Sequence, residues 1–248
     1  MMPLPRPNLS ATFELDLPVS KKKIKLRQFT VKEQHILLLA DQTEELAQLY
    51  VAIKQIIQNC DVEETIEDID KSFSRMEYIF MYLRGISFDN QIELRMGHVD
   101  NINNKGEECD HKGDFVLNIG DIQIENTELV NEIPLDDSGE KVLHLRPPTY
   151  KTVENLKNLP EDLEESQVEK LMIVDHIQMY MDGEEMFKRE DYSNDEWIEF
   201  LDSMFVDVYD KLLEYFRTLP KMTYKGTYIC SKCGCEERVE MDGLSDFL

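Results

Sequence analysis

The chain has 248 residues, of which 42% are hydrophobic and 31% charged, and its formal net charge is −24 at pH 7. This length and apolar content allow a sizeable core, in one large or two small domains, and exclude a disordered polymer. The net charge predicts no binding to nucleic acid or to an anionic membrane surface, because both would repel the protein. No apolar run approaches the ~18 residues that span a bilayer.

The cysteines and the first residues indicate the cellular compartment of the protein. Five cysteines, an odd number without a regular framework, fit a reducing environment. The segment from Met1 to Pro7 lacks the apolar core of a signal peptide. We therefore expect a soluble intracellular protein.

The charge is unevenly distributed. Residues 1–30 carry +4, whereas residues 161–215 hold 18 acidic and 4 basic side chains, a net charge of −14. One interpretation is a set of solvated helix faces that keep the protein soluble. The other is an acidic surface that binds a basic partner.

The N-terminal third predicts a hairpin followed by helices. Pro3, Pro5 and Pro7 favour an extended arm. Apolar residues alternate on both sides of a turn at residues 18–20, which predicts a β-hairpin. These residues are Phe13, Leu15, Leu17, Ile24, Leu26 and Phe29. Thr30 and Glu33 have the spacing of a capping box.

Helical patterns follow this capping box. Residues 36–40 and the run 76–84 predict buried helical segments, and residues 46–57 predict a helix with an apolar stripe. Cys60 at the end of the stripe is expected to be a small core residue.

The middle and the C-terminal part differ in texture. Between residues 91 and 148, short alternating segments and turn residues predict a small antiparallel sheet. Helices return after residue 149, one of them opened by a capping box of Ser193 and Glu196, and a last hairpin carries a cysteine cluster. The predicted fold is α+β: a helical core with an N-terminal β-hairpin, an inserted small antiparallel sheet and a C-terminal Cys-containing hairpin. Its expected parts are residues 1–90, 91–148 and 149–248.

The cysteine cluster near the C-terminus is the strongest chemical signal. Cys230 and Cys233 form a Cys-x-x-Cys followed by Gly234, and a turn of this kind can direct two thiolates at one metal ion. The sequence therefore predicts half of a zinc site. The alternative is a pair of ordinary thiols on a terminal hairpin.

The other half of this site would come from a distant segment. Cys109 and His111 lie in a predicted turn region, and with Cys230 and Cys233 they would make a tetrahedral Cys₃His set, a normal composition for structural zinc. Cys235 is a substitute ligand. Zinc is thus the candidate cofactor.

Signals of catalysis are missing from the sequence. There is no Gly-x-Ser-x-Gly, no Gly-rich phosphate loop and no Cys–His pair in a catalytic context. We predict that the protein is not an enzyme.

Several stretches together resemble the baseplate hub assembly proteins of T-even-like contractile-tail phages. They are Pro3-Leu4-Pro5 leading to Phe13-Glu14-Leu15, the segment 29–34, Glu77-Tyr78-Ile79-Phe80 with Leu83-Arg84, then Glu199-Phe200-Leu201, Phe216 to Lys221, Cys230-x-x-Cys233-Gly234 and Gly243-Leu244-x-Asp246-Phe247. This resemblance implies a non-enzymatic late protein in the host cytoplasm that binds phage baseplate hub proteins and helps to build the central hub. It carries over no catalytic residues.

Two other functional classes stay open. A permanent structural component of the virion baseplate would share the fold. A zinc-ribbon nucleic-acid binder would use the same cysteines, but residues 21–27 would be the chief source of its basic face.

Overall fold

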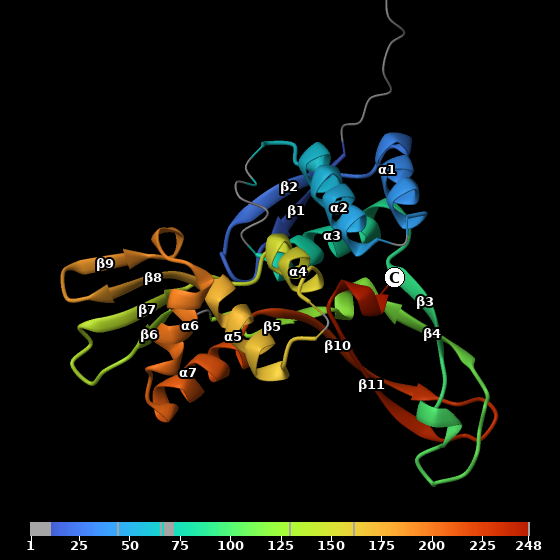
Figure 1. The fold of residues 1–248 in the computed structure, drawn as a ribbon. Helices are drawn as coiled ribbons and strands as arrows, with labels where there is room; N and C mark the ends of the chain where they lie inside the picture. Colours follow the sequence, from blue (N-terminus) through green and yellow to red (C-terminus); the bar gives the residue numbers. More distant parts are fainter. Residues whose placement is uncertain are drawn as a thin grey trace, which may run out of the picture. The chain divides into compact units, whose positions relative to one another are not determined.

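The computed structural model describes residues 11–43, 45–64, 66, 72–128, 130–160 and 162–247 (Figure 1). The predicted proline arm at residues 3–7 lies outside the described residues, as does Leu248. The chain divides into two compact units. The first unit comprises Met1–Glu67, Ser74–Glu125 and Lys221–Leu248, and the inserted unit comprises Asp68–Phe73 and Asn126–Pro220. The inserted unit thus interrupts the first unit in sequence.

The predicted fold class is confirmed. The protein is a mixed α+β structure with several small antiparallel sheets, an N-terminal hairpin and a C-terminal hairpin that contains the cysteines.

The N-terminal hairpin follows the predicted alternation. Strands β1 (Thr12–Asp16) and β2 (Lys23–Arg27) pair antiparallel, with Leu15 opposite Ile24, and both of these side chains are buried. Helix α1 (Val31–Asp41) then begins with the predicted capping box, in which Thr30 N–H donates to Glu33 Oε2 at 2.8 Å. Alternation and cap chemistry therefore predicted this segment correctly.

Two further helices complete the helical part of the first unit. They are α2 (Leu46–Cys60) and α3 (Phe73–Ser87). Cys60 is fully buried, as expected of a small core residue. The prediction that residues 36–40 are buried is wrong for Leu38 and Leu39, which are 50% and 65% exposed. A run of consecutive apolar residues encircles a helix, and α1 turns only part of its surface towards α2.

Two long hairpins extend from these helices in the first unit (Figure 1). The first consists of β3 (Gln91–Met96) and β4 (Gly113–Asn118), and the second of β10 (Lys221–Ile229) and β11 (Glu236–Asp242). Phe115 of the first hairpin makes edge-on ring contacts with Tyr224 and Tyr228 of the second. Strand β5 (Gln123–Glu125) also pairs with β10 and places Glu125 opposite Lys221, so the ends of the insertion are neighbours.

The inserted unit combines a four-stranded sheet with helices. The strands, in spatial order, are β6 (Glu132–Pro134), β7 (Lys141–Leu145), β8 (Ile177–Asp182) and β9 (Glu185–Lys188). The helices are α4 (Tyr150–Lys157), α5 (Glu165–His176), α6 (Asn194–Asp202) and α7 (Val206–Arg217). Buried residues of β7, α5, α6 and α7 form one core that includes Leu143, Trp197 and Leu212. The predicted capping box of Ser193 and Glu196 opens α6.

Strand pairing differs from the expected single small sheet between residues 91 and 148. The strands of this segment are divided among three sheets, because β5 pairs with β10 and β7 pairs with β8. Periodicity identifies a strand but not its partner. Partner choice here depends on residues far away in the sequence.

Candidate metal centre

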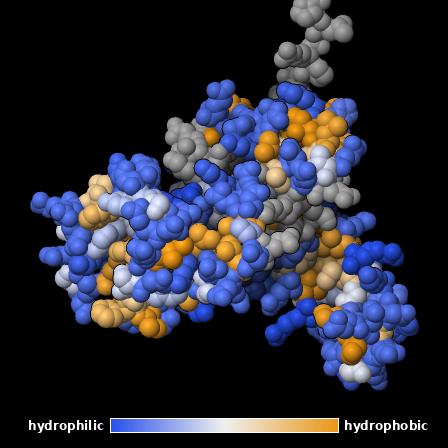
Figure 2. Space-filling model, in the orientation of Figure 1, coloured by the Kyte–Doolittle hydropathy of each residue, from blue (hydrophilic) through white to orange (hydrophobic). Residues whose placement is uncertain are grey.

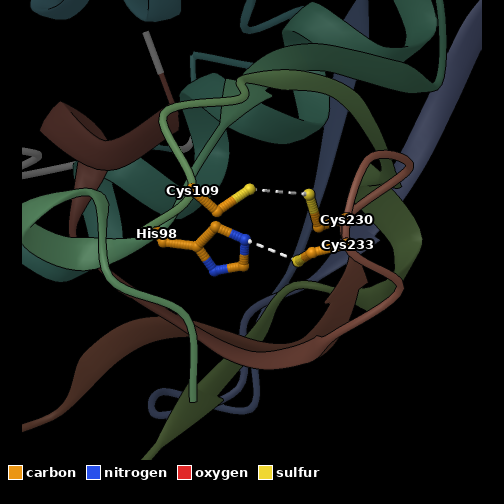
Figure 3. Close-up of side chains that lie close together, drawn as sticks. All are labelled: His98, Cys109, Cys230 and Cys233. Atoms are coloured by element: carbon orange, nitrogen blue, oxygen red, sulfur yellow. Dashed lines mark hydrogen bonds between the residues drawn. The ribbon is translucent and has the colours of Figure 1, made fainter. Parts of the chain in front are cut away.

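Two loops of the first unit bring four metal-ligating side chains together (Figure 3). His98 and Cys109 come from the loop that joins β3 to β4, whereas Cys230 and Cys233 come from the turn that joins β10 to β11. The four candidate ligand atoms all lie within 4.8 Å of one another, and three of the four residues are buried. Cys109 and Cys230 are 121 positions apart in the sequence.

The turn that carries Cys230 and Cys233 is fixed by backbone hydrogen bonds. Gly234 N–H donates to the Cys230 carbonyl at 2.8 Å, and Cys230 N–H donates to the Cys235 carbonyl at 2.9 Å. Gly234 has φ = 69°, a left-handed conformation in which a side chain is disfavoured. Gly234 therefore allows the tight turn that directs the thiols of Cys230 and Cys233 to the same side.

The loop that carries His98 and Cys109 is fixed mainly by one buried side chain. Asn103 is 4% exposed, and its Oδ1 accepts hydrogen bonds from the backbone N–H groups of Lys105 and Glu107, both at 3.0 Å. Cys109 N–H donates to the Asn101 carbonyl at 2.7 Å. These bonds hold the loop in a shape that places Cys109 towards Cys230.

The ligand atoms approach one another closely. Cys109 Sγ lies 3.8 Å from Cys230 Sγ, and His98 Nε2 lies 3.3 Å from Cys233 Sγ (Figure 3). On the other side of the imidazole ring, His98 Nδ1 lies 2.8 Å from Glu237 Oε1, and the His98 side chain is fully buried.

The surroundings favour thiolates in the turn. The hydrogen bond from Cys233 N–H to Cys230 lowers the pKa of the Cys230 thiol to about 6, and Cys235 N–H lowers the pKa of Cys233 in the same way. The hydrogen bond with Cys230, followed by the one with Glu237, raises the pKa of His98 to about 9. Thiolates are the form that binds a metal ion.

The thiol on the opposite loop behaves differently. The backbone N–H of His111 favours the Cys109 thiolate, but burial and the nearby Cys230 outweigh it and raise the pKa of Cys109. Binding of a metal ion would displace the protons from the three thiols and from His98 Nε2. The buried group of His98, Cys109, Cys230 and Cys233 could therefore bind a metal such as zinc.

The comparisons with known proteins identify the family. A family model described as T4 bacteriophage base plate protein matches residues 10–248. The chain belongs to this family. Comparisons with curated proteins and with solved structures gave no significant match. The protein is thus a phage baseplate protein. In the described part of this baseplate protein, no helix has the length and apolarity that crossing a membrane requires.

Three of the four residues proposed from the sequence lie in the metal-ligating group. His111 does not, because its Nε2 lies 2.7 Å from Ser231 Oγ, outside the group. The histidine that lies in this group is His98. Cys235, the proposed substitute ligand, is buried but is likewise not in the group.

The register of the β3–β4 hairpin, which the structure provides, relates His98 to His111. The β3–β4 register pairs Met96 with Gly113, so continuing it by two residues on each side places His98 opposite His111. Both histidines are therefore candidates at the end of one hairpin. Only the three-dimensional structure shows that His98 turns towards the cysteines.

Proposed function

We propose that this protein is a non-enzymatic assembly factor that helps to build the central hub of the phage baseplate by binding hub proteins in the host cytoplasm. Membership of the baseplate protein family over residues 10–248 supports a role in the baseplate. The stretches that resemble hub assembly proteins support the more specific role. The observation that carries the proposal is an aromatic groove in the strongly acidic inserted unit.

The groove lies between the β8–β9 hairpin and α6 and has a volume of about 200 Å³. Its lining residues are Tyr180, Phe187, Tyr192, Glu196, Trp197 and Phe200. The rings support one another, because Tyr180 stacks on Phe187 at 5.5 Å and contacts Phe200 at 4.9 Å between centroids. Trp197 Nε1–H donates to the Arg189 carbonyl at 3.2 Å. The groove is therefore formed before any partner binds.

Negative charge surrounds this groove. Residues 177–202 contain nine acidic and two basic residues, and most of these carboxylates are exposed. Figure 2 shows the inserted unit, at the left of the view, as a largely hydrophilic surface broken by hydrophobic patches. Arg189 is occupied by hydrogen bonds to the Val174 and Tyr192 carbonyls. An aromatic floor with an acidic rim fits a segment that carries arginine or lysine, because the rings bind the cation and its stem while the rim complements its charge.

We accordingly propose that a basic segment of a hub protein occupies the groove. Substituting both Phe187 and Tyr192 by Ala should weaken hub-protein binding at least tenfold, as expected when aromatic anchors are lost from an interface. Phe205→Ala is the matched control, because Phe205 is an aromatic residue of the same unit that is 79% exposed outside the groove. Equal binding by both variants would refute the proposed groove contact.

A phage deletion tests the assembly role itself. Infection by a phage that lacks the gene should stop tail assembly at the hub stage, and normal tails would refute the proposal. The alternative, a permanent structural component, predicts that the protein is present in purified particles. The nucleic-acid-binding alternative is disfavoured by the net charge of −24.

We also propose that the protein carries zinc as a structural cofactor at the group of His98, Cys109, Cys230 and Cys233. Three thiols and one imidazole are a common ligand set for structural zinc, and the low pKa of Cys230 supports metal binding near neutral pH. The prediction made from the sequence is thereby changed at one position, from His111 to His98.

A further inference from the structure

Glu237 of β11 is placed to control the orientation of His98. Its Oε1 lies 2.8 Å from His98 Nδ1 and also accepts a hydrogen bond of 3.1 Å from Asn104 N–H. A carboxylate beside Nδ1 keeps the proton on that nitrogen. Once a metal ion displaces the proton on Nε2, the lone pair of that nitrogen points towards the sulfur atoms, as coordination requires.

We propose that Glu237 positions His98 as the fourth ligand of a closed zinc clamp that locks the β3–β4 loop onto the β10–β11 turn. This inference rests on the zinc proposed above and adds the residue that orients the ligand and the role of the metal. Carboxylates that hold a zinc-binding histidine through its second nitrogen are a common arrangement around zinc.

Two of the six separations between the ligand atoms are close to the edges of a tetrahedral zinc site, and all six are within 4.8 Å. Zn–S bonds of about 2.3 Å and Zn–N bonds of about 2.0–2.1 Å give tetrahedron edges of about 3.8 Å between sulfurs and about 3.6 Å between sulfur and nitrogen. The observed separations are 3.8 Å for Cys109 Sγ to Cys230 Sγ and 3.3 Å for His98 Nε2 to Cys233 Sγ. Four protein ligands leave no coordination position for water or substrate. The site is therefore structural rather than catalytic.

Individual hydrogen bonds join the two loops: Asn104 Nδ2–H donates to the Glu236 carbonyl at 2.7 Å, and His111 Nε2 lies 2.7 Å from Ser231 Oγ. The β3–β4 and β10–β11 hairpins belong to different sheets, and within the described residues no ladder of backbone hydrogen bonds joins them. The ion pair of Lys232 with Asp110, at 2.7 Å, connects the loops at the surface, where both side chains are more than half exposed. Exposed ion pairs contribute little to stability. A buried metal with two ligands from each loop would be the strong link between them.

Zinc affinity measured on the full-length protein tests the role of Glu237. We expect about one zinc per chain in protein purified without chelator. Competition with a chromogenic chelator should show affinity roughly 10–100-fold weaker for Glu237→Ala, with partial recovery in Glu237→Gln, which keeps an acceptor oxygen. Glu236→Gln, an exposed neighbour on the same strand, is the matched control and should bind zinc like the unsubstituted protein.

The ligand assignment is tested by the two histidines. His98→Ala should lose tight zinc binding, His98→Cys should retain it as a Cys₄ site, and His111→Ala should be unaffected. Absence of zinc from the unsubstituted protein would refute the zinc proposal. Bound zinc with unchanged affinity in Glu237→Ala would refute this inference and leave the zinc proposal intact. Loss of zinc in His111→Ala instead of His98→Ala would refute the ligand set of both proposals.

Hydrogen exchange tests the clamp. Removing the metal should speed amide exchange in residues 97–112 and 228–237, while exchange in residues 132–217 stays unchanged, because the link is local to the two loops. Unchanged protection of both loops after zinc removal would show that the metal does not lock them.

Discussion

Glu77 of α3 accepts a hydrogen bond of 2.9 Å from the backbone N–H of Leu244, although the two residues are 167 positions apart. Tyr50 Oη of α2 donates a second hydrogen bond to the same carboxylate oxygen at 3.3 Å. Glu77 is 3% exposed, and burial raises its pKa to about 7 despite these donors. One buried carboxylate therefore connects two helices to the C-terminal segment.

This contact predicts a pH dependence of stability. The pKa of Glu77 is raised from 4.5 to about 7 in the folded protein. Its contribution to the free energy of unfolding is therefore fully present below about pH 4.5 and is lost as the pH rises through 7. The loss is about 3 kcal/mol in the free energy of unfolding. Glu77→Gln should remove this dependence, as measured by urea unfolding between pH 4.5 and 8. Glu93→Gln, at an exposed position, should keep it, and parallel pH profiles for the two variants would contradict the prediction.

Glu33 should give the protein the opposite pH dependence of stability, with a loss at low pH. Burial opposes its ionisation, but hydrogen bonds from Arg27 and Thr30 outweigh burial and lower its pKa to about 2. Its contribution is therefore present above about pH 4.5 and is lost as the pH falls towards 2. Glu33→Gln should destabilise the protein by about 2 kcal/mol at pH 7, because Arg27 loses its carboxylate partner, and by less at pH 3. Urea unfolding at both pH values checks this, and an equal loss at both would count against it.

Binding of hub proteins should depend on salt. The 14 excess negative charges in residues 161–215 are exposed for the most part, and exposed charges are screened over about 10 Å at 0.1 M salt. Raising the salt concentration from 0.05 to 0.5 M should weaken the complex by roughly an order of magnitude, chiefly through slower association. Titration calorimetry and stopped-flow mixing measure both effects. Salt-independent binding would mean that the acidic surface serves solubility alone.

The core of the inserted unit supplies a packing test. Leu212 of α7 is fully buried in the cluster that contains Trp197. Leu212→Ala should cost about 2–5 kcal/mol of unfolding free energy, because it leaves a cavity. Trp197 is the sole tryptophan of the chain, so its fluorescence reports unfolding of this unit. Val206→Ala on the same helix, where the side chain is 77% exposed, should change the midpoint of unfolding little.

Local patterns in the sequence predicted local structure well. The alternation around residues 18–20 defined the first hairpin, and the capping residues Thr30 and Ser193 marked the starts of α1 and α6. The β8–β9 hairpin was not predicted, because Ile177 extends the apolar pattern of α5 without a break. Pairing with β7, which sets Leu143 opposite Tyr180, and with β9 on the other side makes this segment a strand.

The candidate site was predictable in part for the same reason. The spacing of Cys230 and Cys233 is local and could be read directly, whereas the proximity of Cys109 depends on how two hairpins pack. The choice between His98 and His111 depends on the direction in which each side chain leaves the end of the hairpin. The contact with Glu237, 139 positions from His98, settles that direction and has no sequence signature.

The pairing of Glu125 with Lys221 gives the protein a modular architecture. After Glu125 the polypeptide leaves the first unit and re-enters it at Lys221, a neighbouring position, so a tight turn could close the gap if residues 126–220 were excised. The short segment Asp68–Phe73, which also belongs to the inserted unit, would remain. A different module could be inserted at this junction if its own N- and C-termini lie close together. Related phages could thus exchange the acidic, groove-bearing module for one suited to another hub protein while the rest of the scaffold, with its cysteine turn, is retained.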